Sequence, residues 1–463
     1  MKRREFVTSL AAAVAASASA ASAQVPQLPR VRVNVVIRNA YVLTMDPAVP
    51  DLPVGDVHVR NGAIAAVGRS LAAPGAEDID GRNTIVCPGF VETHWHMWNG
   101  ILRGLVLDGP TWGYFPLQRL ADAFTTYDHY SAVRFAATEA LNAGITTVHN
   151  YSHGLRNMGD TDAEMQALVD AGIRARFGYG SFRGDQPFPY ARADLGRVQR
   201  EWIASGGADG LLTLGICSAI GPTWEADIET ARRMGIGVSA HGGGDTADLP
   251  ALARAGLLGP DVQLIHMLNT PPAGIAAIAA TGTMVSLAPF TEAIAPMGLP
   301  PVVELTRGGV PLRNISLSVD VTAQSSADMF AMMRAIVGVA RMQTREQYAM
   351  VPRQALEMAT VAGARNLGLE ATVGTLTPGK RGDVVMVRTD AINMMPGAGL
   401  DPTRLLVLCA RPENVDTVLV DGRLVKRGGR LVGVDVADVV ARASASLAGI
   451  RERAKLPPLD LNA

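Results

Sequence analysis

The sequence predicts an α/β fold, a closed (β/α)8 TIM-like barrel with a small composite β domain formed by both ends of the chain. Between residues 85 and 370, eight apolar, β-branched runs alternate with Ala-, Leu- and Arg-rich segments of helical period, as parallel strands alternate with crossover helices. Shorter strand-like segments with glycine turns flank this region. An open doubly wound sheet is the alternative, but no G-x-G-x-x-G motif follows the first run to support a nucleotide-binding version.

The first 23 residues have the three parts of a cleaved export signal. A basic start, Lys2-Arg3-Arg4, precedes a weakly apolar Ala-rich run, and Ala21-Ser22-Ala23 forms a cleavage site. The arginine pair resembles a twin-arginine signal, although Lys2 stands where that signal usually has Ser or Thr. We expect export by the twin-arginine machinery, cleavage near Ala23, and a periplasmic or secreted protein. An ordinary signal for export of the unfolded chain is the alternative.

Two β-rich pieces should enclose the barrel. Residues 24–84 contain the strand-like segments VNVVIRNAYVLTM and DVHVRNGAIAAVG, and residues 371–433 contain GTLTPGKRGDVVMV and VDTVLVDGRLVKRGG. We expect these two pieces to form one β domain, residues 85–370 to form the barrel, and residues 434–463 to form a C-terminal helical tail.

The barrel strands are expected in eight runs, in this order: IVCPGFVETHWH, GITTVHNYSH, IRARFGYGSF, LLTLGICSAI, IGVSAHGGG, VQLIHML, TMVSLAPFTE and NISLSVDVTA. Helical segments such as SAVRFAATEALNAG and PPAGIAAIAATG lie between them. Each of these segments closes with a glycine before the next run, which is a common signal for the end of a helix.

The composition excludes several classes of partner. The chain has 463 residues, 48% of them hydrophobic, and a formal net charge of -1 without a basic cluster, so we expect a large core and no nucleic-acid partner. Beyond the export signal no apolar run of about twenty residues occurs, so we expect no stable membrane association. The three cysteines are odd in number and far apart, and they are interpreted as small buried hydrophobic residues. A homo-oligomer is left open.

Histidines gather where the predicted strands end. His94 and His96 lie two apart in VETHWH, so both side chains can face one point on the same side of a strand. His241 ends the fifth run, His266 the sixth, and Asp320 the eighth. Imidazoles with one carboxylate suit Zn²⁺ or a related transition metal and leave a position for water. A satisfied core histidine is the alternative for His241 or His266 taken singly.

Through these residues the sequence resembles the amidohydrolase superfamily, and within it the branch that contains cytosine deaminase and the triazine and chloro-heterocycle hydrolases. The resemblance rests on PGFVETHWH, on SAVRFAATEALNAGITTVHN, on the later histidines and aspartate, and on PGKRGDVV, and it covers almost the whole mature chain. It implies that one metal is held by His94, His96, His241 and Asp320, and that His266 is a catalytic or substrate-orienting residue.

Two departures from the family pattern shape the prediction. Binuclear relatives bridge two metals with a carboxylated lysine in the barrel, but no lysine falls within the eight runs, so we expect one divalent metal, Zn²⁺ with Fe²⁺ as the alternative. Deaminases of this branch carry a Glu three residues after the fifth-strand histidine, and that position is Gly244 here. Asp245 or Glu292 could supply the missing acid, although each also suits an outward or helix-capping carboxylate.

The remaining histidines and nearby aromatics are candidates for substrate binding. We expect His149 and His153 to hydrogen-bond the substrate, and Trp98 and Trp112, with Tyr114 and Phe290, to stack a planar ring; local packing is the alternative for the aromatics. Glu292 is a further candidate for binding the substrate.

The sequence therefore predicts an exported mononuclear metal-dependent hydrolase acting on a C–N bond of a small cyclic amide, amidine or N-heterocycle. The metal would lower the pKa of its water toward about 7, Asp320 would carry the proton, and His266 would stabilise charge on the substrate. Two alternatives stay open. One is hydrolysis of a halide or an ester or lactone on the same scaffold, and the other is a non-catalytic metal-containing binding protein.

Overall fold

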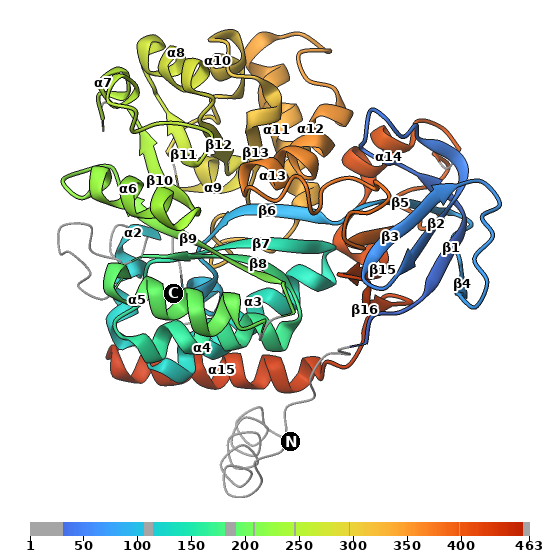
Figure 1. Ribbon diagram of the computed structural model, residues 1–463, viewed down its shortest axis with the longest axis horizontal. Coiled ribbons are helices and arrows are strands. Elements are labelled where there is room, and N and C mark those ends of the chain that lie inside the picture. The colour runs from blue at the N-terminus through green and yellow to red at the C-terminus, as the bar shows by residue number, and fades with distance from the viewer. Residues whose placement is uncertain are drawn as a thin grey trace, which may run out of the picture.

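The computed structural model describes residues 31–105, 114–180, 191–206, 209–244, 247–295, 297–397 and 399–456. Figure 1 shows a barrel of strands ringed by helices beside a second sheet. The predicted fold class is confirmed: one eight-stranded parallel sheet curls into a nearly closed barrel, and strands from both ends of the chain build the other sheet. No helix in the described ranges combines the length and apolarity that crossing a bilayer requires.

The barrel strands neighbour one another in chain order. They are β6 (Phe90–Trp95), β7 (Ile145–Ser152), β8 (Arg174–Tyr179), β9 (Leu212–Ala219), β10 (Gly237–Gly243), β11 (Val262–Leu268), β12 (Met284–Leu287) and β13 (Ile315–Leu317). Most of their side chains are buried, because helices cover the outside and side chains fill the inside. The C-terminal end of β10 is the exception, since His241 is exposed there.

The barrel closes where β13 meets β6, through backbone hydrogen bonds made by the segment that follows β13. The Asp320 amide donates to the His94 carbonyl at 3.0 Å, and the His96 amide donates to the Asp320 carbonyl at 2.9 Å. The carboxylate of buried Glu92 accepts from the backbone amides of His94 at 2.8 Å and Val319 at 2.7 Å. This seam therefore holds three of the predicted site residues in register.

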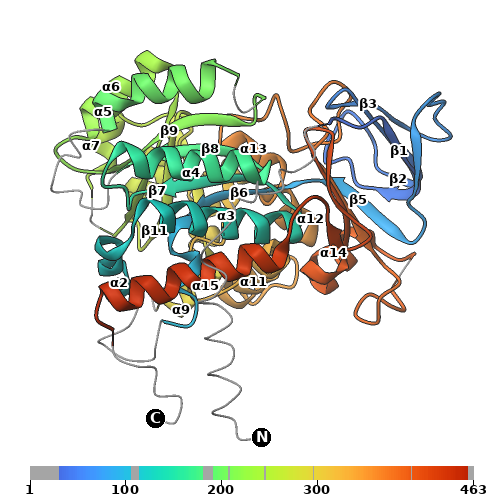
Figure 2. The same cartoon turned by 90° about the horizontal axis from the view of Figure 1, so that it is seen from below.

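Helices surround the barrel, and α15 runs along α3 on its outer side (Figure 2). Gly172, Gly235 and Gly282 end α4, α6 and α8 in the left-handed conformation, as their positions in the sequence predict. The helices are α2 (Tyr114–Leu117), α3 (Thr126–Asn142), α4 (Met158–Ala171), α5 (Ala191–Val198), α6 (Trp224–Met234), α7 (Leu249–Arg254), α8 (Pro272–Thr281), α9 (Pro289–Ile294), α10 (Val302–Arg307), α11 (Met329–Thr344), α12 (Pro352–Met358), α13 (Val361–Asn366), α14 (Pro402–Cys409) and α15 (Val436–Arg453). Short 3₁₀ turns η1 (Met97–Leu102), η2 (Gln118–Ala123), η4 (Leu312–Asn314) and η5 (Pro412–Asn414) and a π turn η3 (Gln199–Ala204) complete the set.

The second sheet has nine strands and its own apolar core. Its strands are β1 (Val35–Val42), β2 (Leu52–Arg60), β3 (Ala63–Gly68), β4 (Glu77–Asp80), β5 (Thr84–Pro88), β14 (Val384–Arg388), β15 (Val415–Val420), β16 (Arg423–Arg427) and β17 (Arg430–Leu431). β14 pairs with β5, which joins the late strands to the early ones. A buried ion pair at 2.9 Å between Arg174 and Asp383 ties this sheet to the barrel.

Two expected strands differ from the structure. The run IVCPGFVETHWH is not one barrel strand, because β5 belongs to the second sheet and the barrel begins with β6. The chain changes sheets at Gly89, where an added Cβ would lie 2.0 Å from the Thr146 hydroxyl, so only glycine fits the approach. The run TMVSLAPFTE also divides, since β12 ends at Leu287 and Pro289 begins α9, which carries Glu292.

Candidate metal centre

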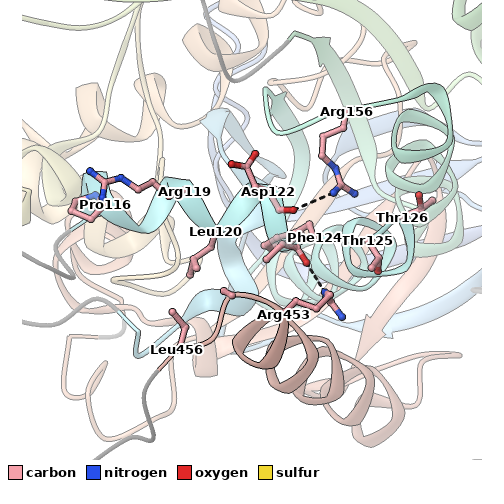
Figure 3. A pocket seen from close by; sticks show the side chains of 12 residues that line it. Pro116, Arg119, Leu120, Asp122, Phe124, Thr125, Thr126, Arg156, Arg453 and Leu456 are labelled. Carbon is pink, nitrogen blue, oxygen red and sulfur yellow. Dashed lines mark hydrogen bonds between the residues drawn. The ribbon is translucent and has the colours of Figure 1, made fainter.

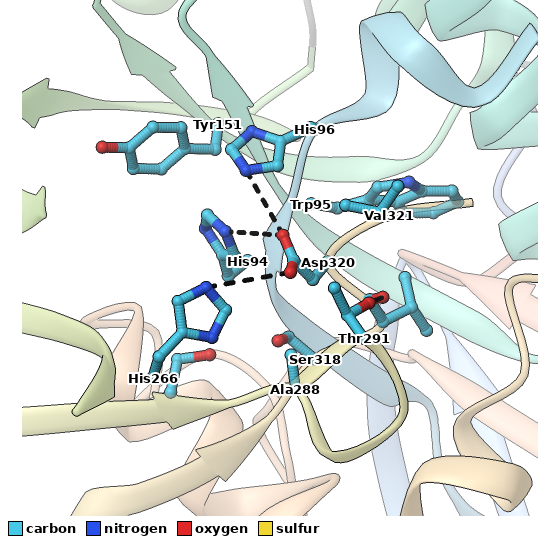
Figure 4. A network of polar contacts seen from close by, with 12 residues as sticks. His94, Trp95, His96, Tyr151, His266, Ala288, Thr291, Ser318, Asp320 and Val321 are labelled. Atoms are coloured by element: carbon cyan, nitrogen blue, oxygen red, sulfur yellow. Dashed lines mark hydrogen bonds and ion pairs between the residues drawn. The ribbon is translucent and has the colours of Figure 1, made fainter. Parts of the chain in front are cut away.

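Histidines from β6, β10 and β11 converge on Asp320 at the C-terminal end of the barrel. Figure 4 shows His94, His96 and His266 around the Asp320 carboxylate. One ligand atom from each of His94, His241, His266 and Asp320 lies within 4.8 Å of the others. The His94 Nε2 atom is 3.0 Å from Asp320 Oδ1, and the His266 Nε2 atom is 3.8 Å from Oδ2. The cluster therefore lies at the barrel face where catalytic residues of this architecture are found.

His96 completes the cluster from the other side of His94. Its Nε2 atom is 3.3 Å from Asp320 Oδ1, and its ring centroid lies 4.6 Å from that of His94 and 5.3 Å from that of His241. The structure thus brings together all five residues that the sequence predicted as ligands or catalytic groups: His94, His96, His241, His266 and Asp320.

The electrostatics of the cluster fit a divalent cation. Burial, reinforced by neighbouring histidines, lowers the pKa of His94 and of His96 well below the usual value, so both rings are neutral and each has a lone pair to offer. Both ring nitrogens of His94 and Oδ1 of Asp320 are buried and form no hydrogen bond within the described residues. Buried polar atoms without partners are costly, and a metal among them would remove that cost.

His266 differs from the other histidines because a carboxylate holds it. Its Nδ1 atom is 3.0 Å from Oε1 of Glu292, and that oxygen also accepts from the Ala288 amide at 2.9 Å. Burial favours the neutral ring, but the hydrogen bond with Glu292 and the charge of Asp320 outweigh burial and raise the pKa of His266. Glu292 is fully buried, and its Oε2 atom has no hydrogen-bond partner in the described chain.

The position of the missing family Glu is free of close contacts from the described residues. Gly244 has φ of +55°, its amide donates to the Leu268 carbonyl at 2.6 Å, and an added Cβ would have no atom of these residues within 4 Å. Asp245, the other acid suggested by the sequence, lies outside the described residues. Among the two candidates, Glu292 is therefore the one that the structure places against the cluster.

The predicted substrate-binding residues lie in different surroundings. The Nδ1 atom of His153 is 3.0 Å from Nδ1 of His96, and burial lowers the pKa of His153 to about 4. Trp98 is fully buried, with its ring centroid 5.7 Å from that of His153 and 5.2 Å from that of Phe124, which favours local packing over stacking of a substrate. Trp112 lies outside the described residues.

His149 lies inside the barrel. Its Nδ1 atom is 3.0 Å from the Thr93 carbonyl, and its Nε2 atom is 3.9 Å from Sγ of Cys217. These protein neighbours enclose the ring, which is fully buried, so direct contact with a substrate at the cluster is not favoured. Phe290 lies on α9 and is 38% exposed.

Sequence reasoning missed two residues of the site. Tyr151 packs the edge of its ring against the cluster, with centroids 4.8 Å from those of His94 and His241, and its hydroxyl donates to the Ser218 carbonyl at 3.1 Å. Its position midway between His149 and His153 on one strand face was the available signal. Glu92 secures the seam through two backbone amides, and nothing in its sequence context reveals that contact.

A separate cleft of about 780 Å³ opens on the outside of the barrel, between η2, the start of α3 and the end of α15 (Figure 3). Three arginines line it, but Arg156 and Arg453 donate to the backbone carbonyls of Asp122 and Ala123. The cleft contains none of the predicted site residues.

Comparisons with known proteins identify the family of this chain. The model of the amidohydrolase family matches residues 85–425. The 5'-deoxyadenosine deaminase of Methanosarcina mazei is 27% identical over 89% of this chain and 96% of its own, and the 5-methylthioadenosine/S-adenosylhomocysteine deaminase of Desulforudis audaxviator is 28% identical over 89% and 97%.

Solved structures with the same fold include two zinc-containing proteins. An adenosine deaminase from Xanthomonas campestris superposes with a TM-score of 0.79 at 22% identity, over 91% of this chain and 99% of its own. An atrazine chlorohydrolase from Arthrobacter aurescens superposes with a TM-score of 0.78 at 21% identity, over 89% and 100%.

Proposed function

Because the chain belongs to the amidohydrolase family, we propose that it is a mononuclear metal-dependent hydrolase that cleaves a carbon–nitrogen bond, other than a peptide bond, of a small N-heterocycle, cyclic amide or amidine. The observation that carries this proposal is the convergence of His94, His241, His266 and Asp320 within 4.8 Å at the catalytic face of the barrel. The names of the similar deaminases support an amino-substituted ring as the first substrate class to test.

Four residues would hold the metal: His94, His96, His241 and Asp320. The zinc in both similar structures supports Zn²⁺, with Fe²⁺ as the alternative. Bound there, the metal would activate water for attack at neutral pH. No lysine occurs in the barrel strands to bridge a second ion, which supports a single metal.

Asp320 and His266 would perform the proton chemistry. The Asp320 carboxylate, whose Oδ1 atom is 3.0 Å from His94 Nε2 and 3.3 Å from His96 Nε2, would lie beside both the metal and its water, so it would take a proton from the attacking water and return it to the leaving amine. His266, held by Glu292, would donate to the substrate atom on which negative charge develops. With an amino-substituted ring, the oxygen of water adds to the ring carbon, the exocyclic C–N bond breaks, and ammonia or an amine leaves. With a cyclic amide or amidine, the ring C–N bond breaks, the nitrogen stays attached to the opened chain, and the product gains one water.

Because position 244 is a glycine, hydrolysis of a halide, ester or lactone is a second candidate activity. A deaminase must protonate the ring nitrogen, and the residue that does so in this branch is missing. An ester or lactone has no ring nitrogen to protonate, and chloride, unlike an amine, leaves without taking up a proton, so these reactions demand less proton transfer. The fold does not decide which bond is cleaved. A non-catalytic binding protein is the remaining alternative, and metal-dependent turnover of any compound would exclude it.

The test uses the chain from Gln24 onward, loaded with Zn²⁺ or Fe²⁺ and screened by mass spectrometry against amino-heterocycles, cyclic amides, lactones and chlorinated rings. Loss of an amine with gain of oxygen supports the proposal, as does gain of water by a cyclic amide. Loss of chloride or opening of lactones alone would replace the proposal with the second activity. Asp320→Asn should abolish turnover, and Asp261→Asn, at a surface ion pair with Arg232, is the matched control.

We also propose that the protein is exported through the twin-arginine pathway, because Arg3-Arg4 precedes an Ala-rich run and a small-residue cleavage site. Cell fractionation of the full chain tests this proposal. Replacing both arginines by lysine should retain the protein in the cytoplasm, and unchanged export would favour the ordinary secretion signal.

A further inference from the structure

A buried arginine without a countercharge lies inside the barrel, away from the metal cluster. Arg176 on β8 is 3% exposed, and its Nε and Nη2 atoms form no hydrogen bond within the described residues. Burial lowers the pKa of its guanidinium only to about 10, so the group is charged at neutral pH. An unpaired buried cation is strongly destabilising unless an anion accompanies it.

The other buried arginines of the described chain have carboxylates beside them. Arg174, two residues earlier on the same strand, forms a bidentate pair with Asp383, and Arg423 pairs with Asp421. Arg134 also has unpaired nitrogens, but Asp170 and Asp438 act on it electrostatically. Among the described residues, the ionisable side chains that act on Arg176 are the thiol of Cys217 and the imidazole of His149. Burial raises the pKa of the thiol well above its usual value and lowers the pKa of His149 well below its usual value, so both groups are neutral.

The Arg176 guanidinium packs against glycines on the two following strands, β9 and β10. An added Cβ at Gly215 on β9 would lie 2.4 Å from Nε of Arg176, and one at Gly237 on β10 would lie 2.7 Å from Nη2. The guanidinium therefore lies against bare backbone of β9 and β10. This close approach of both strands disfavours a bulky anion such as a phosphate and points to a monatomic one.

Further unpartnered hydroxyls face the same interior. Ser239 lies two residues beyond Gly237 on β10, and Thr147 lies two residues before His149 on β7, so both share the inward faces of their strands. Both hydroxyl oxygens are buried without a hydrogen-bond partner among the described residues. A hydroxyl can also donate a hydrogen bond to an anion.

We propose that Arg176 binds a chloride ion in the interior of the barrel, beneath the metal cluster. The ion neutralises the guanidinium and accepts hydrogen bonds from it. It acts as a structural ion, and this proposal does not depend on the reaction that the metal cluster catalyses.

Bromide tests the position of the ion. Crystals of the mature chain grown in bromide should show an anomalous peak against the Arg176 guanidinium. A peak only at the metal cluster, or ordered water alone beside Arg176, overturns the proposal.

Thermal unfolding tests the energetics in solution. With chloride replacing gluconate at constant ionic strength, each tenfold rise above the dissociation constant should raise the midpoint of the wild-type chain by about 1.5 °C. Arg176→Met should lose this dependence, whereas Arg134→Met, which removes a buried arginine with carboxylates nearby, should keep it. An equal chloride effect in wild type and Arg176→Met would contradict the proposal. If Arg176→Met does not fold, the bromide experiment on the wild-type chain decides alone.

Discussion

Replacing Glu292 by Gln tests the hydrogen bond that orients His266. The glutamine carbonyl can still accept from the Ala288 amide and from Nδ1 of His266, so the geometry at 2.9 and 3.0 Å is kept. Only the negative charge is lost. A hydrogen bond to a charged partner contributes about 1 kcal/mol more than a neutral one, and this difference corresponds to somewhat less than one pKa unit.

The direction of the pH effect follows from the same contact. Glu292 raises the pKa of His266, so the substitution lowers it and the ring loses its proton at a lower pH. If protonated His266 donates to the substrate, the alkaline limb of kcat/KM should move to lower pH by up to one unit, and kcat/KM should fall about fivefold on that limb. The assay is a pH profile of the metal-loaded enzyme on the substrate found in the screen.

Glu304→Gln is the matched control, since Glu304 lies on α10 and contacts the Gln343 amide at the surface. Its profile should match that of the wild-type enzyme, and the metal content of both variants should be unchanged. An unshifted alkaline limb in Glu292→Gln, with kcat/KM within twofold of wild type, would refute a role for the Glu292 charge.

Two further predictions concern stability and the open site. Lys426 is buried with its Nζ donating to the Asn142 carbonyl at 2.6 Å, and burial lowers its pKa from 10.5 to about 8. The resulting cost of about 3 kcal/mol is full below pH 8 and disappears toward pH 10.5. Lys426→Met should therefore raise the free energy of unfolding at pH 7 by about 2 kcal/mol, once the lost hydrogen bond is subtracted. In denaturant titrations, the stability of this variant should rise less between pH 8 and 10.5 than that of the wild-type chain, and equal pH dependence would contradict this. Gly244→Ala should lower stability by about 1 kcal/mol through its left-handed backbone alone, because an added Cβ meets no atom of the described residues within 4 Å. Metal content should be unchanged, and loss of metal would contradict that reasoning.

The residues that the sequence located well are those whose position follows from strand periodicity. His94 and His96 share a strand face, and His241, His266 and Asp320 lie where parallel strands end, so their convergence follows once the barrel is assumed. The family match over residues 85–425 confirms the resemblance based on these motifs.

Contacts between distant segments explain what the sequence did not reveal. The division of the first run at Gly89 depends on Thr146, which approaches from the neighbouring strand, and the apolar pattern continues across the break. The pairing of Glu292 with His266 requires α9 to begin at Pro289, directly after a short strand. The absence of a carboxylate beside Arg176 among the described residues could not be predicted from the sequence, because it depends on glycines and neutral side chains of neighbouring strands.

Backbone strain at the cluster explains how the protein aims its ligands. His266, Met267 and Asp320 have φ values of 69°, 55° and 59°, a left-handed region that costs a residue other than glycine about 1–2 kcal/mol. At Asp320, the seam offsets this cost, because the backbone bonds to His94 and His96 fix the peptide on both sides. The carboxylate is thus held toward His94 by the barrel itself. Asparagine tolerates the left-handed region well, so Asp320→Asn removes the charge while keeping the backbone, and loss of turnover in that variant reports on the carboxylate rather than on the fold.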